Sequence, residues 1–210
     1  MQELGVDKST PRESGDKSPH STSFTDSKSF TDSKSFKWPH APPHLLKERG
    51  AYMVTGATLN KVHYFKSDLE LDLLQNTLLT LAEQYDWKME AWAIFPNHYH
   101  FIAQSPDDPT NLKKFITHFH AATARQLNME HCTLGRKVWF QYWDTQLTFQ
   151  SSYFARLNYV MQNPVKHKVV KCADDYKWCS ASWFKQNTSK SHYLTVTNFK
   201  IDQVSVVDDF

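Results

Sequence analysis

Residues 88–103 read KMEAWAIFPNHYHFIA, and the dipeptide Pro96-Asn97 divides this stretch into two apolar-rich runs. Residues 88–95 and 98–103 are rich in aromatic and aliphatic side chains, which is typical of strands. Pro96-Asn97 is a common turn pair, because Pro restricts φ and Asn tolerates turn conformations. The stretch therefore predicts a β-hairpin, whose two strands are antiparallel.

Segments on both sides of this hairpin alternate between strand and helix patterns. Strand patterns occupy residues 51–59 and 137–142, the second being equally compatible with a loop. Helical patterns occupy residues 69–85, 111–128 and 151–163. Pro164 is expected to end the last helix, since proline cannot continue one. We expect an α+β fold, in which helices pack on a single sheet that contains the antiparallel hairpin.

The first 37 residues have a different composition, dominated by Ser, Thr, Lys and Asp, and the hexapeptide SFTDSK at 23–28 is repeated at 29–34. With one apolar residue in each six-residue repeat, residues 1–37 bury too little surface to offset the entropy of ordering, and we expect them to be disordered. The folded domain is expected to occupy residues 38–189. Residues 190–210 have weak periodicity and an acidic end, and are expected to form a weakly structured tail.

Charge and composition narrow the class of protein. The 210-residue chain has a net charge of +2, but residues 38–200 hold 18 basic and 13 acidic side chains, so the body is mildly basic. No apolar run approaches the ~18 residues of a membrane span and the polar N-terminus has no signal-peptide core, so we expect a cytoplasmic protein without membrane contact. Cys132, Cys172 and Cys179 lack CxxC spacing, which predicts buried or inert thiols rather than a disulfide framework or a thiolate zinc site.

The chain contains two His-x-His pairs, and the predicted secondary structure separates them. On a strand, alternate side chains point the same way, so His98 and His100 can bind one metal ion together. On a helix, residues two apart lie about 200° apart, so His118 and His120 cannot. Two hydrogen-bonded strand histidines without a metal remain an equally good interpretation of the first pair.

The last predicted helix gathers polar side chains on one side. Tyr159 and Asn163 lie about 40° apart on a helical wheel. They flank Arg156 and Ser152, beside the apolar face. Each has an ordinary interpretation, because a helical tyrosine usually packs its ring and exposes its hydroxyl, and Asn163 before Pro164 suits a helix end.

Two separated motifs, FPNHYH at residues 95–100 and YVMQNPV at 159–165, together resemble the HUH single-strand tyrosine transposases of bacterial insertion sequences. The pattern is most similar to the REP-associated tyrosine transposases, the subfamily associated with repetitive extragenic palindromes. Flanking landmarks extend the resemblance to roughly residues 38–184. Phe95 stands where methionine is common, and Tyr99 is larger than the usual aliphatic residue. The resemblance implies an HUH endonuclease fold with a ferredoxin-like or RRM-like palm.

The resemblance also implies a chemistry. His98 and His100, with Asn163 as third ligand, would hold one Mg²⁺ or Mn²⁺, and nitrogen ligands favour Mn²⁺ on hard–soft grounds. Tyr159 would attack a phosphorus of single-stranded hairpin DNA and form a 5′-phosphotyrosine intermediate. Retaining the bond energy in this way permits strand transfer in DNA transposition and recombination without ATP. The acceptor of the Tyr159 proton, the DNA sequence, and the choice between monomer and homodimer stay open.

Candidate DNA contacts in the basic body are assigned from charge. They are Lys113, Lys114, Arg136, Lys137, Arg156, Lys166 and Lys168. Aromatic residues that could stack on bases are Trp139, Phe140, Tyr142 and Trp143. A solvated basic face and buried aromatic side chains explain the same residues, so none is expected to read a specific base.

Two alternatives to a transposase stay open. One is a non-catalytic, regulatory protein that binds hairpin DNA and is derived from such an enzyme; retention of His98, His100, Tyr159 and Asn163 argues against it. The other is a replication-nicking protein or metal hydrolase that uses the same histidine pair without transposition.

Overall fold

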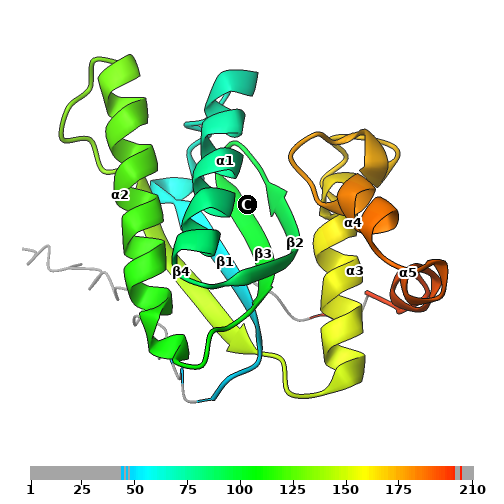
Figure 1. Ribbon diagram of the computed structural model, residues 1–210. Helices are drawn as coiled ribbons and strands as arrows, with labels where there is room; N and C mark the ends of the chain where they lie inside the picture. Colours follow the sequence, from blue (N-terminus) through cyan, green and yellow to red (C-terminus); the bar gives the residue numbers. More distant parts are fainter. Residues whose placement is uncertain (1–43, 45, 47, 202–203, 205–210) are drawn as a thin grey trace, which may run out of the picture. The chain divides into compact units, whose positions relative to one another are not determined.

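Four strands form one antiparallel sheet (Figure 1). The computed structural model describes residues 44, 46, 48–201 and 204. The strands are β1 (Ala51–Thr58), β2 (Lys88–Ile94), β3 (His98–Gln104) and β4 (Trp139–Gln146). Their order is β2-β3-β1-β4, and every neighbouring pair is antiparallel. The predicted hairpin is confirmed as β2 and β3, and its turn is closed by the Phe95 N–H, which donates to the His98 carbonyl at 2.9 Å.

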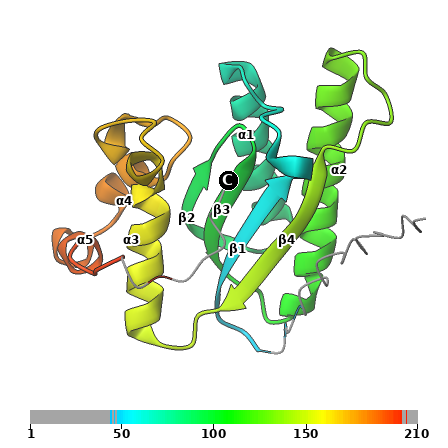
Figure 2. The same ribbon diagram turned by 180° about the vertical axis from the view of Figure 1, so that it is seen from behind.

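Helices α1 (Asp68–Gln84) and α2 (Leu112–Glu130) cover one face of the sheet, as the opposite views of Figures 1 and 2 show. Helix α3 (Gln150–Lys166) packs against β2 and β3. The shorter helices α4 (Ala181–Asn187) and α5 (Lys190–Thr197) follow it, and single 3-10 turns lie at Leu59–Lys61, Pro109–Asn111 and Ala173–Asp175. The order β1-α1-β2-β3-α2-β4 is that of a ferredoxin-like fold. The predicted α+β class and palm are confirmed.

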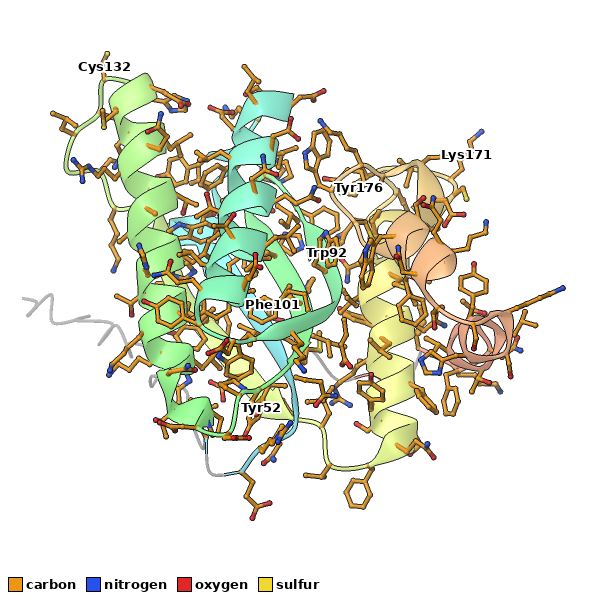
Figure 3. All side chains as sticks on the ribbon, in the orientation of Figure 1. Tyr52, Trp92, Phe101, Cys132, Lys171 and Tyr176 are labelled. Atoms are coloured by element: carbon orange, nitrogen blue, oxygen red, sulfur yellow. The ribbon has the colours of Figure 1, made fainter. Side chains whose placement is uncertain are left out.

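The layer between the sheet and helices α1 and α2 holds the large apolar side chains. Tyr52 and Phe101, labelled in Figure 3, are fully buried there. Tyr99 points into the same layer and contacts Phe119 of α2 with ring centroids 5.2 Å apart. Gly56 makes room for the Tyr99 ring, because a Cβ at residue 56 would lie 2.4 Å from Tyr99 Cζ. The large side chain of Tyr99, between the two histidines of β3, is therefore accommodated by the glycine opposite it on β1.

The outer edge of β2 is covered by the segment that precedes α4. The Trp92 N–H donates to Ser180 Oγ at 2.9 Å, and the Ser180 N–H donates back to the Trp92 carbonyl at 2.8 Å. The Ile94 N–H donates to the Trp178 carbonyl at 3.0 Å. These bonds satisfy backbone groups that an open edge strand would expose, and they hold the segment after α3 against the sheet.

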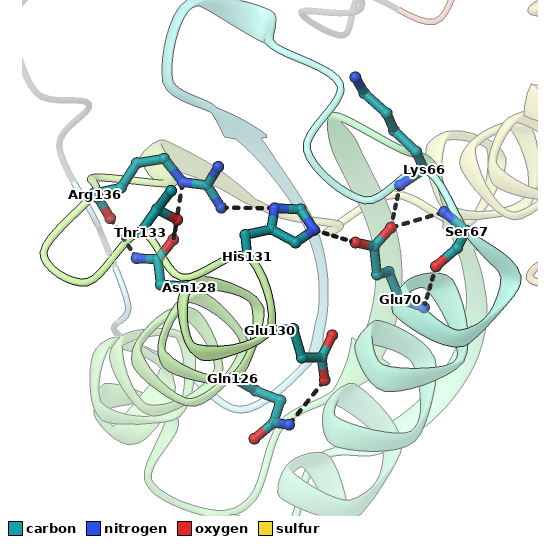
Figure 4. A network of polar contacts seen from close by, with 9 residues as sticks. All are labelled: Lys66, Ser67, Glu70, Gln126, Asn128, Glu130, His131, Thr133 and Arg136. Carbon is teal, nitrogen blue, oxygen red and sulfur yellow. Dashed lines mark hydrogen bonds and ion pairs between the residues drawn. The ribbon is translucent and has the colours of Figure 1, made fainter.

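A polar network joins the beginning of α1 to the end of α2 (Figure 4). Ser67 caps α1 and forms a capping box with Glu70. The other Glu70 oxygen contacts His131 Nε2 at 2.6 Å, and His131 Nδ1 lies 3.2 Å from an Arg136 nitrogen. Arg136 also donates to Asn128 Oδ1 at 2.9 Å. Burial raises the pKa of Glu70, but hydrogen bonds from Ser67 and His131 outweigh it and hold that pKa below its ordinary value.

Helix α3 does not end at Pro164, as we had predicted, but continues to Lys166. Pro164 has no N–H to donate to the Val160 carbonyl one turn earlier. The Cys179 thiol approaches the carbonyls of Val160 and Met161, at 4.0 and 3.4 Å. This contact compensates part of the lost hydrogen bonding, and the extra turn brings residues after Pro164 back toward the sheet.

Residues 190–197, expected in a weakly structured tail, form helix α5. Val196 is fully buried, and Asn158 Nδ2 of α3 donates to the carbonyls of Thr197 and Phe199 at 3.2 and 2.8 Å. Tertiary contacts with α3 thus stabilise a helix whose sequence has weak periodicity. The predicted tail at residues 1–37, and positions 202–203 and 205–210, lie outside the described residues.

The three cysteines are free thiols. Cys132, which projects at the end of α2 in Figure 3, and Cys172 are exposed, whereas Cys179 is buried. Burial raises the pKa of the Cys179 thiol to about 12, which makes it unreactive. Within the described part of the chain, none of the helices has the length and apolar character needed to cross a membrane.

Candidate active site and metal centre

His98 and His100 lie on the side of β3 that faces α3, while Tyr99 between them points to α2. Their ring centroids are 5.2 Å apart, and both side chains are buried. The two imidazoles therefore share one side of the strand, as alternation along β3 predicted.

Hydrogen bonds orient both rings. Asn97 Nδ2 donates to the Lys61 carbonyl at 3.1 Å, so its Oδ1 is the atom 2.8 Å from His98 Nδ1. His98 Nδ1 is then the protonated nitrogen, and Nε2 is the nitrogen that can coordinate a metal. Thr55 Oγ1, on the neighbouring strand, lies 2.7 Å from His100 Nδ1 and can orient that ring in the same way.

A third imidazole, that of His167, lies beside this pair. Its ring centroid is 5.0 Å from that of His98. One potential ligand nitrogen from each of His98, His100 and His167 lies within 4.8 Å of the others. The sequence motifs did not predict His167 as a site residue, because a helix ended by Pro164 would leave it in a loop. Its spacing of four residues from Asn163 was the available signal, since residues four apart share a helix face.

Tyr159 and Asn163 lie on the side of α3 that meets β3. The Tyr159 side chain is 2% exposed, and its ring centroid is 5.9 Å from that of His100. Asn163 is fully buried, and neither its Oδ1 nor its Nδ2 has a hydrogen-bond partner among the described residues. One helical turn separates Asn163 from Tyr159 and another separates it from His167, so its amide is directed toward the same histidines.

This burial differs from the polar ridge that we expected beside the apolar face. Leu157, Val160 and Met161 are buried together with Tyr159 and Asn163, whereas Phe149, which precedes the helix, is 73% exposed. The reason is that α3 packs against the sheet on one side and against α5 on another, so its buried surface is wider than one apolar stripe.

Lys166 adds a positive charge to the tyrosine. Its Nζ donates a hydrogen bond to the Tyr159 hydroxyl at 3.1 Å and lies 4.7 Å from the centroid of the Tyr159 ring. A cation in this position stabilises negative charge on the phenol oxygen.

Aromatic rings pack against the imidazoles. Phe95 stacks on His98 with ring centroids 4.5 Å apart and meets the ring of His167 edge-on at 5.1 Å. Tyr176 stacks on the other side of Phe95 at 5.5 Å and donates from its hydroxyl to the Ile94 carbonyl at 2.8 Å. Phe95, in place of the commoner methionine, thus restricts the orientation of two rings of the cluster.

The two histidines of the second His-x-His pair point in different directions, as their spacing on a helix predicted. His118 is exposed on α2. His120 points toward the sheet, where it contacts the Tyr99 hydroxyl at 2.9 Å and stacks on Trp139 with centroids 4.5 Å apart. Burial lowers the pKa of His120 to about 3, so it is neutral at physiological pH.

The seven basic residues proposed for DNA binding are distributed over several elements. Lys166 is the last residue of α3, and Lys168 follows it, directly after His167 of the histidine cluster in the chain. Arg156 is nearer the beginning of the same helix. Lys113 and Lys114 are exposed in the first turn of α2, while Arg136 and Lys137 follow its far end. Arg136 already contacts His131 and Asn128, so its position has a structural explanation.

Arg156 borders a cavity of about 690 Å³ between α3 and the end of α5 with the residues that follow it. Ser151, Ser152, Thr195, Asn198 and Lys200 contribute polar groups to its wall. Arg156 donates to Ser152 Oγ, and burial lowers the pKa of its guanidinium. A partly desolvated cation in a polar cavity is suited to binding an anion.

The four aromatic residues proposed for stacking differ in exposure. Trp139 is buried in the core, and Tyr142 is stacked with His44 at 4.3 Å. Phe140 and Trp143 are partly exposed. Trp143 is the register partner of Thr55, whose hydroxyl holds His100, so Trp143 lies on the same face of the sheet as the imidazoles.

Three comparisons relate the chain to known proteins. The family model described as "Transposase IS200 like" matches residues 49–163. A curated protein of Haemophilus influenzae, described as a REP-associated tyrosine transposase, is 22% identical, over 62% of this chain and 79% of its own length. A solved structure of a REP-associated tyrosine transposase bound to a REP hairpin covers 80% of this chain and 93% of its own, with 19% identity and a TM-score of 0.56. This last likeness supports the fold.

Proposed function

This chain belongs to the family of IS200-like transposases, which are DNA-cleaving enzymes, and from that membership we propose that it cleaves and rejoins single-stranded hairpin DNA through Tyr159. The observation that carries the proposal is the position of Tyr159, whose ring is 5.9 Å from that of His100 on the side of α3 that also holds Asn163. The proposed nucleophile and the proposed metal ligands thus lie in one site.

In the proposed reaction the Tyr159 oxygen attacks a backbone phosphorus. The new bond joins that oxygen to the phosphorus, and the bond from the phosphorus to the 3′-oxygen of the preceding nucleotide breaks. The phenol loses its proton, and the departing 3′-oxygen takes one up. The products are a 5′-phosphotyrosine and a free 3′-hydroxyl, and attack by another 3′-hydroxyl reverses the step and joins the strands.

The donor set fits a divalent cation, Mg²⁺ or Mn²⁺, held by His98, His100 and Asn163. Asn97 and Thr55 orient the two imidazoles, and the buried Asn163 amide, without a hydrogen-bond partner among the described residues, would gain a ligand contact. When bound, the cation would act as a Lewis acid on the scissile phosphate. Lys166 would stabilise the phenolate form of Tyr159 during attack.

DNA would approach along α3. Lys166 and Lys168 at one end of this helix and Arg156 toward the other would contact phosphates, and Trp143 would offer a stacking surface on the same face of the sheet as His100. A hairpin substrate is suggested by the similar transposase that was solved with a REP hairpin. The number of subunits that act together is left open.

The test uses hairpin DNA with single-stranded flanks, labelled at either end, incubated with the full chain and MnCl₂ and analysed under denaturing conditions. We expect the 3′-labelled fragment to become linked to protein and the 5′-labelled fragment to be released. Tyr159→Phe should form no adduct, whereas Tyr193→Phe, a matched change on α5, should behave as the wild type. Binding without an adduct would favour the non-catalytic alternative. Cleavage without an adduct would favour a hydrolase.

A further inference from the structure

We propose that His167 is a third imidazole ligand of the metal centre and makes this site select transition-metal cations such as Mn²⁺ and Co²⁺ over Mg²⁺. This inference rests on the metal site of the proposed function. It concerns a residue that lies beyond residues 49–163, where the transposase family match ends, and one that the sequence motifs did not include.

Geometry is the first support. Within the described residues, His98, His100 and His167 form the one group of at least three histidine, cysteine or acidic side chains whose ligand atoms lie within 4.8 Å of one another. The ring centroids of His167 and His98 are 5.0 Å apart, similar to the 5.2 Å between His98 and His100. Two nitrogens bound to one ion through metal–imidazole bonds of about 2.0–2.1 Å lie at most about 4.2 Å apart, so small side-chain adjustments would let these three nitrogens bind one ion.

Local structure holds His167 in this place. The backbone N–H of His167 donates to the Asn163 carbonyl at 2.9 Å, so the chain keeps its helical course through Pro164. Phe95 contacts His98 and His167 on the same side of the cluster, with centroids 4.5 and 5.1 Å away. The ring is therefore supported by packing as well as by its backbone, as a ligand that must be held in position requires.

The donor set then determines which cation is preferred. Mg²⁺ prefers oxygen ligands and keeps several of its waters, whereas imidazole suits transition metals. Two histidines and one amide oxygen give a mixed set. A third imidazole gives the set more nitrogen ligands. His167 should therefore increase the ratio of the affinity for Mn²⁺ or Co²⁺ to the affinity for Mg²⁺.

The experiment measures metal binding by the full chain without DNA, so that its outcome does not depend on cleavage. Calorimetric titrations with MnCl₂, CoCl₂ and MgCl₂, and the visible absorption spectrum of bound Co²⁺, are compared for the wild type, His98→Ala, His167→Ala, His167→Gln and His118→Ala. The last variant removes an exposed histidine of α2 and is the matched control. Unfolding curves of the metal-free proteins verify that each variant folds.

We expect His167→Ala to weaken Mn²⁺ and Co²⁺ binding by at least the ~10- to 100-fold that loss of an outer-sphere partner costs, and to change the Co²⁺ spectrum. His167→Gln, which offers an amide oxygen, should lower the preference for Mn²⁺ over Mg²⁺ while retaining more affinity than His167→Ala. His118→Ala should match the wild type.

The proposal is overturned if folded His167→Ala binds Mn²⁺ and Co²⁺ like the wild type while His98→Ala does not, or if the wild type binds Mg²⁺ as tightly as Mn²⁺. The first result would leave the nuclease proposal intact, because His98, His100 and Asn163 would still hold the cation. Conversely, an altered Co²⁺ spectrum in His167→Ala would support the assignment of His167 as a ligand, even if the wild type forms no DNA adduct. The missing adduct would then reject only the proposed nuclease function.

Discussion

Lys166 and Tyr159 lie about two turns apart on α3, and Lys166 Nζ donates a hydrogen bond to the Tyr159 hydroxyl at 3.1 Å. The ammonium also lies over the tyrosine ring, so this exposed side chain covers the group that we propose as the nucleophile. In the proposed reaction the same residue would stabilise the charge on the Tyr159 oxygen during attack.

Replacing Lys166 should therefore slow the chemistry more than it weakens DNA binding. A charge-assisted hydrogen bond is worth about 1.5–3 kcal/mol, so Lys166→Met should reduce the single-turnover rate of adduct formation by about 10- to 100-fold. Lys166→Arg keeps the charge and should retain most of the rate. Lys168→Met, an exposed neighbour, is the control for general loss of positive charge. Equal effects of Lys166→Met and Lys168→Met would show that both act only by binding phosphate.

Asn97 should matter for metal affinity although it is not a ligand. Asn97→Ala removes the oxygen that holds the proton on His98 Nδ1, so the ring loses its preferred tautomer and orientation. We expect about 10- to 100-fold weaker Mn²⁺ binding by calorimetry, with hairpin affinity largely retained. Asn97→Asp keeps an acceptor and should bind Mn²⁺ better than Asn97→Ala. If the two variants are alike, the contact between Asn97 and His98 does not orient the ring.

The fit between Gly56 and Tyr99 predicts a coupled pair of substitutions. Gly56→Ala places a methyl group about where the Tyr99 ring now lies, since the nearest ring atoms would be 2.4–2.5 Å away. Overpacking of this kind costs about 1–3 kcal/mol of unfolding free energy, which urea denaturation measures. Adding Tyr99→Leu should recover part of the loss, because a smaller side chain vacates that space. Additive effects in this double-mutant cycle would contradict the steric explanation.

The lowered pKa of His120 predicts a loss of stability in mild acid. Its pKa is lowered by burial to about 3 in the folded protein, so below its ordinary value of about 6.5 the unfolded chain binds a proton that the folded chain does not. The unfolding free energy should then fall by up to about 1.4 kcal/mol per pH unit below pH 6.5, or about 2 kcal/mol by pH 5. His120→Phe should have a shallower dependence between pH 7 and 5, and His118→Phe, on the exposed side of α2, should keep the wild-type slope. Equal slopes for the two variants would mean that His120 does not carry the effect.

Arg156 should contribute to DNA affinity without entering the reaction. If it binds a phosphate in its cavity, Arg156→Gln should weaken binding of hairpins with single-stranded flanks and lower the slope of log K against log[salt] by about 0.7. Lys88→Gln, at the start of β2, removes the same charge from an exposed residue that is not among the candidate DNA contacts and is the matched control. An unchanged salt slope for Arg156→Gln would exclude a phosphate contact at this residue.

The secondary structure followed from local patterns in the sequence. The run of residues 88–103 predicted β2, β3 and their turn, and the helical spacings predicted α1, α2 and α3 to within a few residues. Strand alternation and helical periodicity also predicted that His98 and His100 share a face whereas His118 and His120 do not. These properties depend on residues close together in the chain, where backbone geometry leaves few alternatives.

Tertiary packing determined the contacts between segments that are far apart in the chain. Contacts with α3 stabilise α5, although its own periodicity is weak, and the Cys179 thiol accommodates the α3 carbonyls near Pro164. Because α3 continues past that proline, His167 joins the imidazoles of β3, and Lys166 reaches Tyr159. The sequence alone determined the elements and the motifs that they carry. The cation beside the tyrosine depended on the continuation of α3 past Pro164, since Lys166 and Tyr159 lie on that same helix. The third imidazole depended on how α3 packs against the sheet, because His167 is 69 and 67 positions away from His98 and His100 in the chain.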